Sequence, residues 1–163
     1  MTDARRRAAL IGGLALLLLL YLHATDPAPP VARLGNDGGA WPIGALKTIS
    51  TSQTVFREWD HDRNGVLDYG TLRQLSDANL IDPLLGSGEK DGYRFETRPS
   101  PTTPEFLWFA VANPIRPGTT GDRYFCTNHS GVIYYTGVQG RAIALDDGGP
   151  ECAVPTTMLP VGK

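Results

Sequence analysis

Oxygen-bearing side chains gather at one place in this sequence, between positions 60 and 69. Carboxylates or an amide stand at the first, third, fifth and ninth positions of that stretch, and Gly65 stands at the sixth. This spacing is typical of the loop of a helix–loop–helix calcium site, in which the seventh position adds a backbone carbonyl. The candidate ligands for Ca²⁺ are Asp60, Asp62, Asn64, the carbonyl of Val66, and Asp68.

Three features of this stretch and of the residues just after it favour a solvated turn instead. The twelfth position of such a calcium loop is normally a bidentate glutamate, and here it is Thr71. Thr71 and Gln74 have the spacing of a capping box, which would begin a helix at this point. The pair Asn64–Gly65 also suits positive φ, and nearby aspartates can accept backbone N–H groups. No cofactor is therefore certain from the sequence, and Ca²⁺ stays the one candidate.

Groups for catalysis or for nucleic-acid binding are scarce. The three histidines, His23, His61 and His129, are far apart along the chain, and no nucleophile elbow or phosphate loop is present. A hydrolase that uses His61 with a neighbouring aspartate is the remaining enzymatic option, but loop residues of this kind are usually just solvated. The formal net charge of −2 gives no basic field for nucleic acid. We therefore expect a protein that is not an enzyme and does not bind nucleic acid.

The first 24 residues predict export across a bacterial inner membrane. Three arginines at positions 5–7 precede an uncharged apolar stretch at positions 8–22, which is typical of a signal peptide or a short uncleaved anchor. As a helix this stretch would span about 22 Å, less than the ~30 Å hydrocarbon core. His23 lies where a cleavage site would need a small residue, which favours an anchor facing the periplasm over a secreted protein. The residues of this membrane segment include Ala8, Leu10, Ile11, Leu14, Leu16, Leu20 and Leu22.

Two cysteines, Cys126 and Cys152, are the whole cysteine content of the chain. In an exported protein they would meet an oxidising compartment, so we predict a disulfide between them. The alternative is two free thiols, one of them buried in a strand. A zinc site is not expected, because the chain has no Cys-x-x-Cys pair.

The elements expected between these residues give an α+β fold. A proline- and glycine-rich linker at 25–41 precedes an amphipathic helix at 42–58, whose apolar residues recur at three- and four-residue spacing up to Trp59. We expect this helix to pack on a three- or four-stranded antiparallel sheet. The predicted strands lie at 93–98, 106–112, 123–126, 132–135 and, as a short last strand, 142–145. The predicted division is 1–24 signal or anchor, 25–41 linker, 42–152 domain and 153–163 tail.

Several short segments, in this order, resemble the head domain of type IV pilins and type II secretion pseudopilins. The resemblance covers about residues 45–136, and its segments are 46–56, 60–69, 87–95, 117–121 and 130–134. The N-terminus departs from that family. Leu14, and not phenylalanine, follows Gly12–Gly13, and no acidic residue stands between Arg7 and Asp26.

The resemblance implies a pilin-like head: a helix packed on an antiparallel sheet and a structural or accessory role in a secretion or pilus-type system. The membrane, through the N-terminal segment, and other envelope or pilin-like proteins are then the expected partners. The alternative is an extracytoplasmic module that binds its ligand in a calcium-dependent way, using the loop at 60–68.

Overall fold

The computed structural model describes residues 40–136 and 140–162. The predicted signal or anchor segment at 1–24 and nearly all of the predicted linker lie outside these residues. Within the two described stretches, no helix is long and apolar enough to cross a bilayer.

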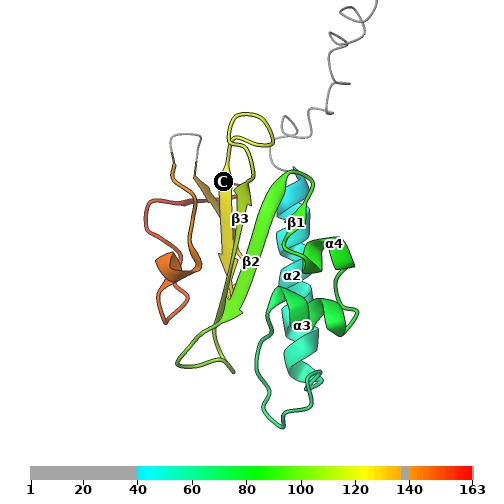
Figure 1. The fold of residues 1–163 in the computed structure, drawn as a ribbon. Helices are drawn as coiled ribbons and strands as arrows, with labels where there is room; N and C mark the ends of the chain where they lie inside the picture. Colours follow the sequence, from blue (N-terminus) through cyan, green and yellow to red (C-terminus); the bar gives the residue numbers. More distant parts are fainter. Residues whose placement is uncertain (1–39, 137–139, 163) are drawn as a thin grey trace, which may run out of the picture. The chain divides into compact units, whose positions relative to one another are not determined.

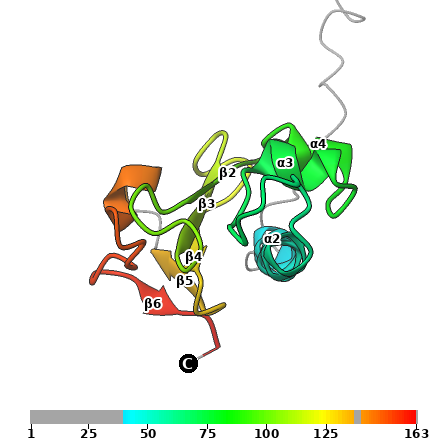
Figure 2. The same cartoon turned by 90° about the horizontal axis from the view of Figure 1, so that it is seen from below.

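One long helix, α2, packs on one face of an antiparallel sheet (Figures 1 and 2). The six strands follow one another in the sheet in chain order, and every pair is antiparallel. The expected α+β layout is thus confirmed. The elements are α2 (Ala40–Glu58), α3 (Leu72–Asp77), α4 (Pro83–Gly86), β1 (Glu89–Lys90), β2 (Tyr93–Pro99), β3 (Trp108–Pro114), β4 (Tyr124–Asn128), β5 (Ile133–Thr136), a 3-10 helix η1 (Leu145–Gly148) and β6 (Leu159–Pro160).

The sheet has six strands where three or four were expected. The additional strands, β1 and β6, are two residues long, so neither carries the alternation that identifies a strand in a sequence. The strand predicted at 142–145 is wrong. Ile143 there bonds through its N–H and its carbonyl to the side chain of Asn113, at 2.9 and 2.8 Å, and 3-10 helix η1 begins at Leu145. A side chain thus takes the hydrogen bonds that a neighbouring strand would have used.

The sheet separates two hydrophobic clusters, because neighbouring residues of a strand point to opposite faces. On β4, Phe125 faces α2 and packs with Leu46, Ile49 and Phe56 of that helix in the first cluster. Cys126 faces the other way, into the second cluster. The chain after β5 covers that second face, as Figure 2 shows on the side of the sheet away from α2.

A buried glutamine connects α2 to the loop before α3. Gln53 is fully buried, and its side-chain amide bonds both backbone groups of Gly70: Nε2 donates to the carbonyl at 2.7 Å, and Oε1 accepts the N–H at 2.9 Å. Nε2 also lies 3.3 Å from the hydroxyl of Thr97 on β2. This one side chain therefore joins the helix, the loop and the sheet.

Gly121 leaves room for a tyrosine hydroxyl. A Cβ at this position would overlap the Oη of Tyr93, which donates to the carbonyl of Arg123 at 3.2 Å. We expect Gly121→Ala to lower the free energy of unfolding by about 2 kcal/mol, measured by urea denaturation, because overpacking displaces the ring or the loop.

Gly44 provides the control for that substitution. A Cβ there meets nothing within 4 Å, and the position lies in α2. Gly44→Ala should therefore raise stability by about 0.5–1 kcal/mol. Tyr93→Leu should reduce the cost of Gly121→Ala, because the added Cβ would also lie 2.5 and 2.7 Å from the Cζ and Cε2 of the Tyr93 ring. A cost that is unchanged in the Tyr93→Leu background would show that the tyrosine side chain is not what the new methyl group meets.

Candidate functional site

The loop after α2 closes around the carboxylate of Asp60. Asp60 follows the helix with positive φ, 45°, and its side chain accepts the N–H groups of Asn64 at 3.1 Å and Gly65 at 3.2 Å. Arg63 and Gly65 also have positive φ, 56° and 80°. The sequence predicted positive φ at Asn64–Gly65, and the structure has it at Gly65 but not at Asn64. The turn is tight because one carboxylate satisfies two successive backbone donors.

The other four predicted ligands bond one another. The amide of Asn64 donates to Asp62 at 3.0 Å, and its Oδ1 accepts the N–H of Val66 at 2.6 Å. The carbonyl of Val66 accepts the N–H of Asp68 at 3.0 Å. The oxygens proposed as calcium ligands are thus brought together, but in this structure several of them bond the loop itself.

Asp68 is the carboxylate that this arrangement disfavours most. Partial burial and then the negative charge of Asp62 raise its pKa above the usual aspartate value, while a hydrogen bond from Asn64 acts in the opposite direction. Across the described stretches, no three side chains of His, Cys, Asp or Glu are arranged to hold a metal ion. The cap prediction is confirmed, since Thr71 and Gln74 form both bonds of a capping box at the start of α3.

Replacing Asp68 by asparagine should make stability less dependent on pH. A carboxyl group with a raised pKa in the folded state binds its proton more tightly there, so wild-type stability should gain as pH falls through that raised pKa. Asp68→Asn should therefore be more stable than wild type at pH 7, and the difference should shrink towards pH 4. Urea denaturation of both proteins at each of these two pH values measures the difference in their stability. A difference of the same size at both pH values would contradict the prediction.

Large apolar side chains beside this loop are exposed, which the sequence analysis missed. Trp59 was expected on the buried stripe of the helix, but it follows the last residue of α2 and is exposed. Phe106 was expected in a buried strand, but β3 begins only at Trp108, and Phe106 is exposed. The signal for Trp59 was its position directly before Asp60, where the helix ends. We found no sequence signal for the exposure of Phe106, since residues 106–112 are continuously apolar.

The two cysteines are free thiols in the structure, both fully buried in the second hydrophobic cluster. The thiol of Cys126 donates to the thioether of Met158 across 3.4 Å, and burial raises its pKa to about 12. Burial also raises the pKa of Cys152, and the positive charge of Arg98 partly offsets this. The disulfide between them stays a prediction. The structure places both residues in the same hydrophobic cluster.

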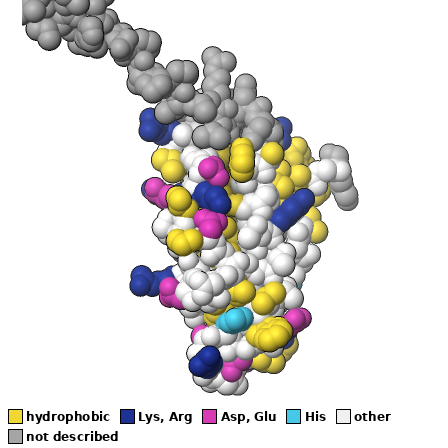
Figure 3. All heavy atoms as spheres, turned by 90° about the vertical axis from the view of Figure 1, so that its right-hand side faces the viewer, with side chains coloured by type: hydrophobic (Ala, Val, Ile, Leu, Met, Phe, Trp, Pro, Cys, Tyr) yellow, Lys and Arg dark blue, Asp and Glu magenta, His cyan; other side chains and the backbone are white. Residues whose placement is uncertain are grey.

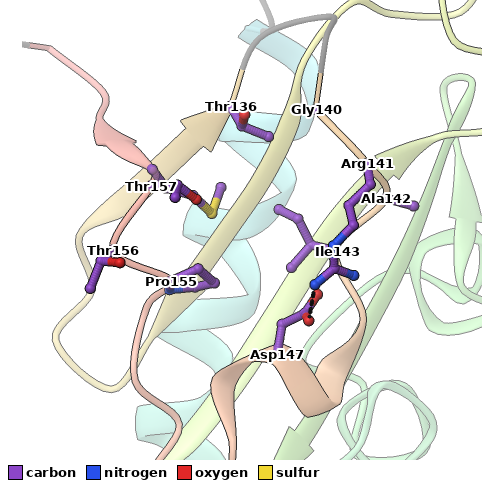
Figure 4. A pocket seen from close by; sticks show the side chains of 10 residues that line it. Thr136, Gly140, Arg141, Ala142, Ile143, Asp147, Pro155, Thr156 and Thr157 are labelled. Atoms are coloured by element: carbon purple, nitrogen blue, oxygen red, sulfur yellow. Dashed lines mark hydrogen bonds and ion pairs between the residues drawn. The ribbon is translucent and has the colours of Figure 1, made fainter.

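A cavity of about 340 Å³ lies beside the same cluster, between the end of β5, the segment before η1 and the chain before β6 (Figure 4). Arg141 and Asp147 form an ion pair across 2.5 Å in its wall, and the hydrogen bond from Arg141 lowers the pKa of Asp147. Asp147 also accepts the N–H of Ala144 at 2.8 Å. The described residues around this cavity include neither a histidine nor a cysteine, and its one carboxylate, that of Asp147, is paired with Arg141.

No family model matches the chain, and neither does a curated protein or a solved structure. The function therefore has to be argued from this chain's own residues.

Proposed function

We propose that the chain is a non-enzymatic, pilin-like envelope protein, tethered to the membrane or exported, with a structural or accessory role in a secretion or pilus-type system. The observation that carries this proposal is the packing of α2, a 19-residue helix laid along an antiparallel sheet whose strands follow in chain order. A helix packed on an antiparallel sheet is also what the resemblance of the short segments to pilin heads implies, which supports the proposal. The polar groups described above bond one another or the backbone, which supports a binding or assembly role over catalysis.

The outer face of α2 is consistent with assembly. The hydroxyls of Thr48, Thr51 and Thr54 donate to backbone carbonyls four residues earlier, at 3.1, 3.1 and 3.4 Å. These hydroxyls are satisfied within the helix, so another surface can cover this face without leaving them unpaired.

Cell fractionation with shearing tests the proposal in the cells that make the protein. Filament material or the membrane pellet should contain the chain, and its intact mass should show whether the N-terminus is trimmed. Protein found only in the cytosol would contradict export, and protein found only as a soluble periplasmic monomer would contradict a structural role in an assembly.

A second candidate function is calcium-dependent binding by the loop at 60–68. The specific observation in its favour is that the carboxylate of Asp60 already accepts the N–H groups of Asn64 and Gly65. The loop therefore folds back on its first carboxylate, as a calcium loop would. Weak sites of this type fill at the millimolar calcium found outside cells.

Thermal unfolding with calcium or with a chelator tests this second function. At a calcium concentration one hundred times Kd, a filled site would stabilise the folded protein by about 2.7 kcal/mol and raise Tm. The double variant Asp60→Asn, Asp62→Asn should lose this gain. Asp77→Asn, an exposed aspartate on α3, should keep it. A wild-type Tm that is the same in calcium and in chelator would rule out the calcium function and leave the envelope role intact.

A further inference from the structure

Four large apolar side chains lie exposed around the C-terminal end of α2. Trp59 is 75% exposed, Phe106 65%, Leu67 49% and Val66 40%. We call these four residues the terminal patch. Single exposed apolar residues are ordinary on a protein surface, whereas several gathered at one place mark an interaction site.

Backbone contacts bring the three segments that carry the patch to one end of the domain. The Nε of Arg57, in the last turn of α2, donates to the carbonyl of Glu105 at 2.6 Å. The N–H of Tyr69, just after the acidic loop, donates to the carbonyl of Pro104 at 3.2 Å. The segment before Phe106 is thereby bonded to both the helix and the loop. Figure 3 shows hydrophobic side chains among charged ones at the lower end of the molecule, where α2 ends in Figure 1.

Negative charge predominates around the patch. Arg57 and Arg63 are the two arginines of the same three segments, against five carboxylates. Arg57 bonds the backbone carbonyl of Glu105 and lies 5.7 Å from the ring of Tyr69. Partial burial, and also the negative charges of Asp62 and Glu105, raise the pKa of Asp68, so these three carboxylates lie close to one another. The five carboxylates are those of Glu58, Asp60, Asp62, Asp68 and Glu105.

We propose that the terminal patch docks a protein partner that presents an apolar side chain within a Lys- or Arg-rich segment. Aromatic residues, Trp and Phe among them, are enriched at the centre of interfaces, and Trp is one of their most frequent anchors. A rim of carboxylates selects a cationic partner and speeds its approach. A membrane of anionic lipids would be repelled by the same rim. A symmetric contact between two copies of this chain would place like charges opposite each other. This inference goes beyond the proposed envelope role, and in it the loop carboxylates act as surface charges and not as calcium ligands.

Photo-crosslinking of the full chain in the cells that produce it tests this proposal. p-Benzoylphenylalanine replaces Trp59 in one variant, Phe106 in a second and Trp41 in a control. Trp41 is also exposed, at 54%, but it lies at the opposite end of α2. We expect a protein adduct from positions 59 and 106 but not from position 41, with a crosslinked peptide rich in lysine and arginine.

The charge of the rim is tested in the same experiment. Asp62→Lys, combined with the crosslinker at 106, should lower the adduct yield about fivefold, because it changes the sign of a rim charge. Asp77→Lys, outside the rim on α3, should leave the yield unchanged. An adduct with a second copy of this chain, with lipid only, or with an acidic peptide would overturn the proposal. So would equal yields from positions 41, 59 and 106, or no adduct at all.

Discussion

Gln53→Leu is expected to lower the free energy of unfolding by about 3–4 kcal/mol. Leucine fills a similar volume but removes the partners of both the N–H and the carbonyl of Gly70, which lie 2.9 and 2.7 Å from the glutamine amide. Gly70 is itself buried, so water cannot replace the lost bonds. A buried backbone group left unpaired costs about 1–3 kcal/mol, and here there are two. Urea denaturation monitored by circular dichroism measures the loss.

Thr51→Leu is the control for this substitution. Thr51 lies in the same helix and is exposed, so its change should stay within about 0.5 kcal/mol of wild type. Gln53→Glu, which keeps an acceptor for the Gly70 N–H, should also be destabilising, because it cannot donate to the Gly70 carbonyl without taking up a proton. A Gln53→Leu variant within 1 kcal/mol of wild type would show that Gly70 finds other partners.

The second large effect is expected from the cysteines. When the chain is exported, we expect Cys126 and Cys152 to form a disulfide and its reduction to cost about 3 kcal/mol, since the bond closes a long loop in the unfolded chain. Burial raises the pKa of both thiols, and the positive charge of Arg98 partly offsets this at Cys152. Because both thiols are buried in the folded protein, we expect the bond to form while the chain folds.

Intact mass and denaturation measure this. Oxidised protein should be about 2 Da lighter than the reduced chain. A reductant should lower the urea concentration at the midpoint of unfolding in wild type, but not in the double variant Cys126→Ser, Cys152→Ser. Met158→Leu removes the thioether beside Cys126 without removing a thiol, so it should still form the bond. Two thiols that react with an alkylating agent in denatured, unreduced protein from the periplasm would contradict the prediction.

The elements with a strong local signal were predictable. The repeat of Leu46, Ile49 and Phe56 predicted the buried side of α2, and the alternation from Tyr93 predicted β2. Thr71 and Gln74 predicted the start of α3, because a capping box forms within one turn of helix. Each of these structures depends on residues close together in the chain.

The candidate site was predictable only in part, because some of its contacts join residues that are far apart in the chain. The spacing from Asp60 to Asp68 indicated a carboxylate loop, and the loop does close on Asp60. The exposed Phe106 beside it depends on how the segment at 101–107 joins Arg57 and Tyr69, far away in the sequence. No local pattern encodes that contact.

The sequence by itself therefore determined the α+β class, the helix, the central strands and the acidic turn, because periodicity, capping and turn chemistry act over a few residues. Only the tertiary structure decided that Gln53 is buried as a link to Gly70, that Asn113 binds Ile143 in place of a strand, and that both cysteines share one cluster. These contacts join residues 17 to 30 positions apart, and they form because buried polar groups must find a partner once packing has removed them from water.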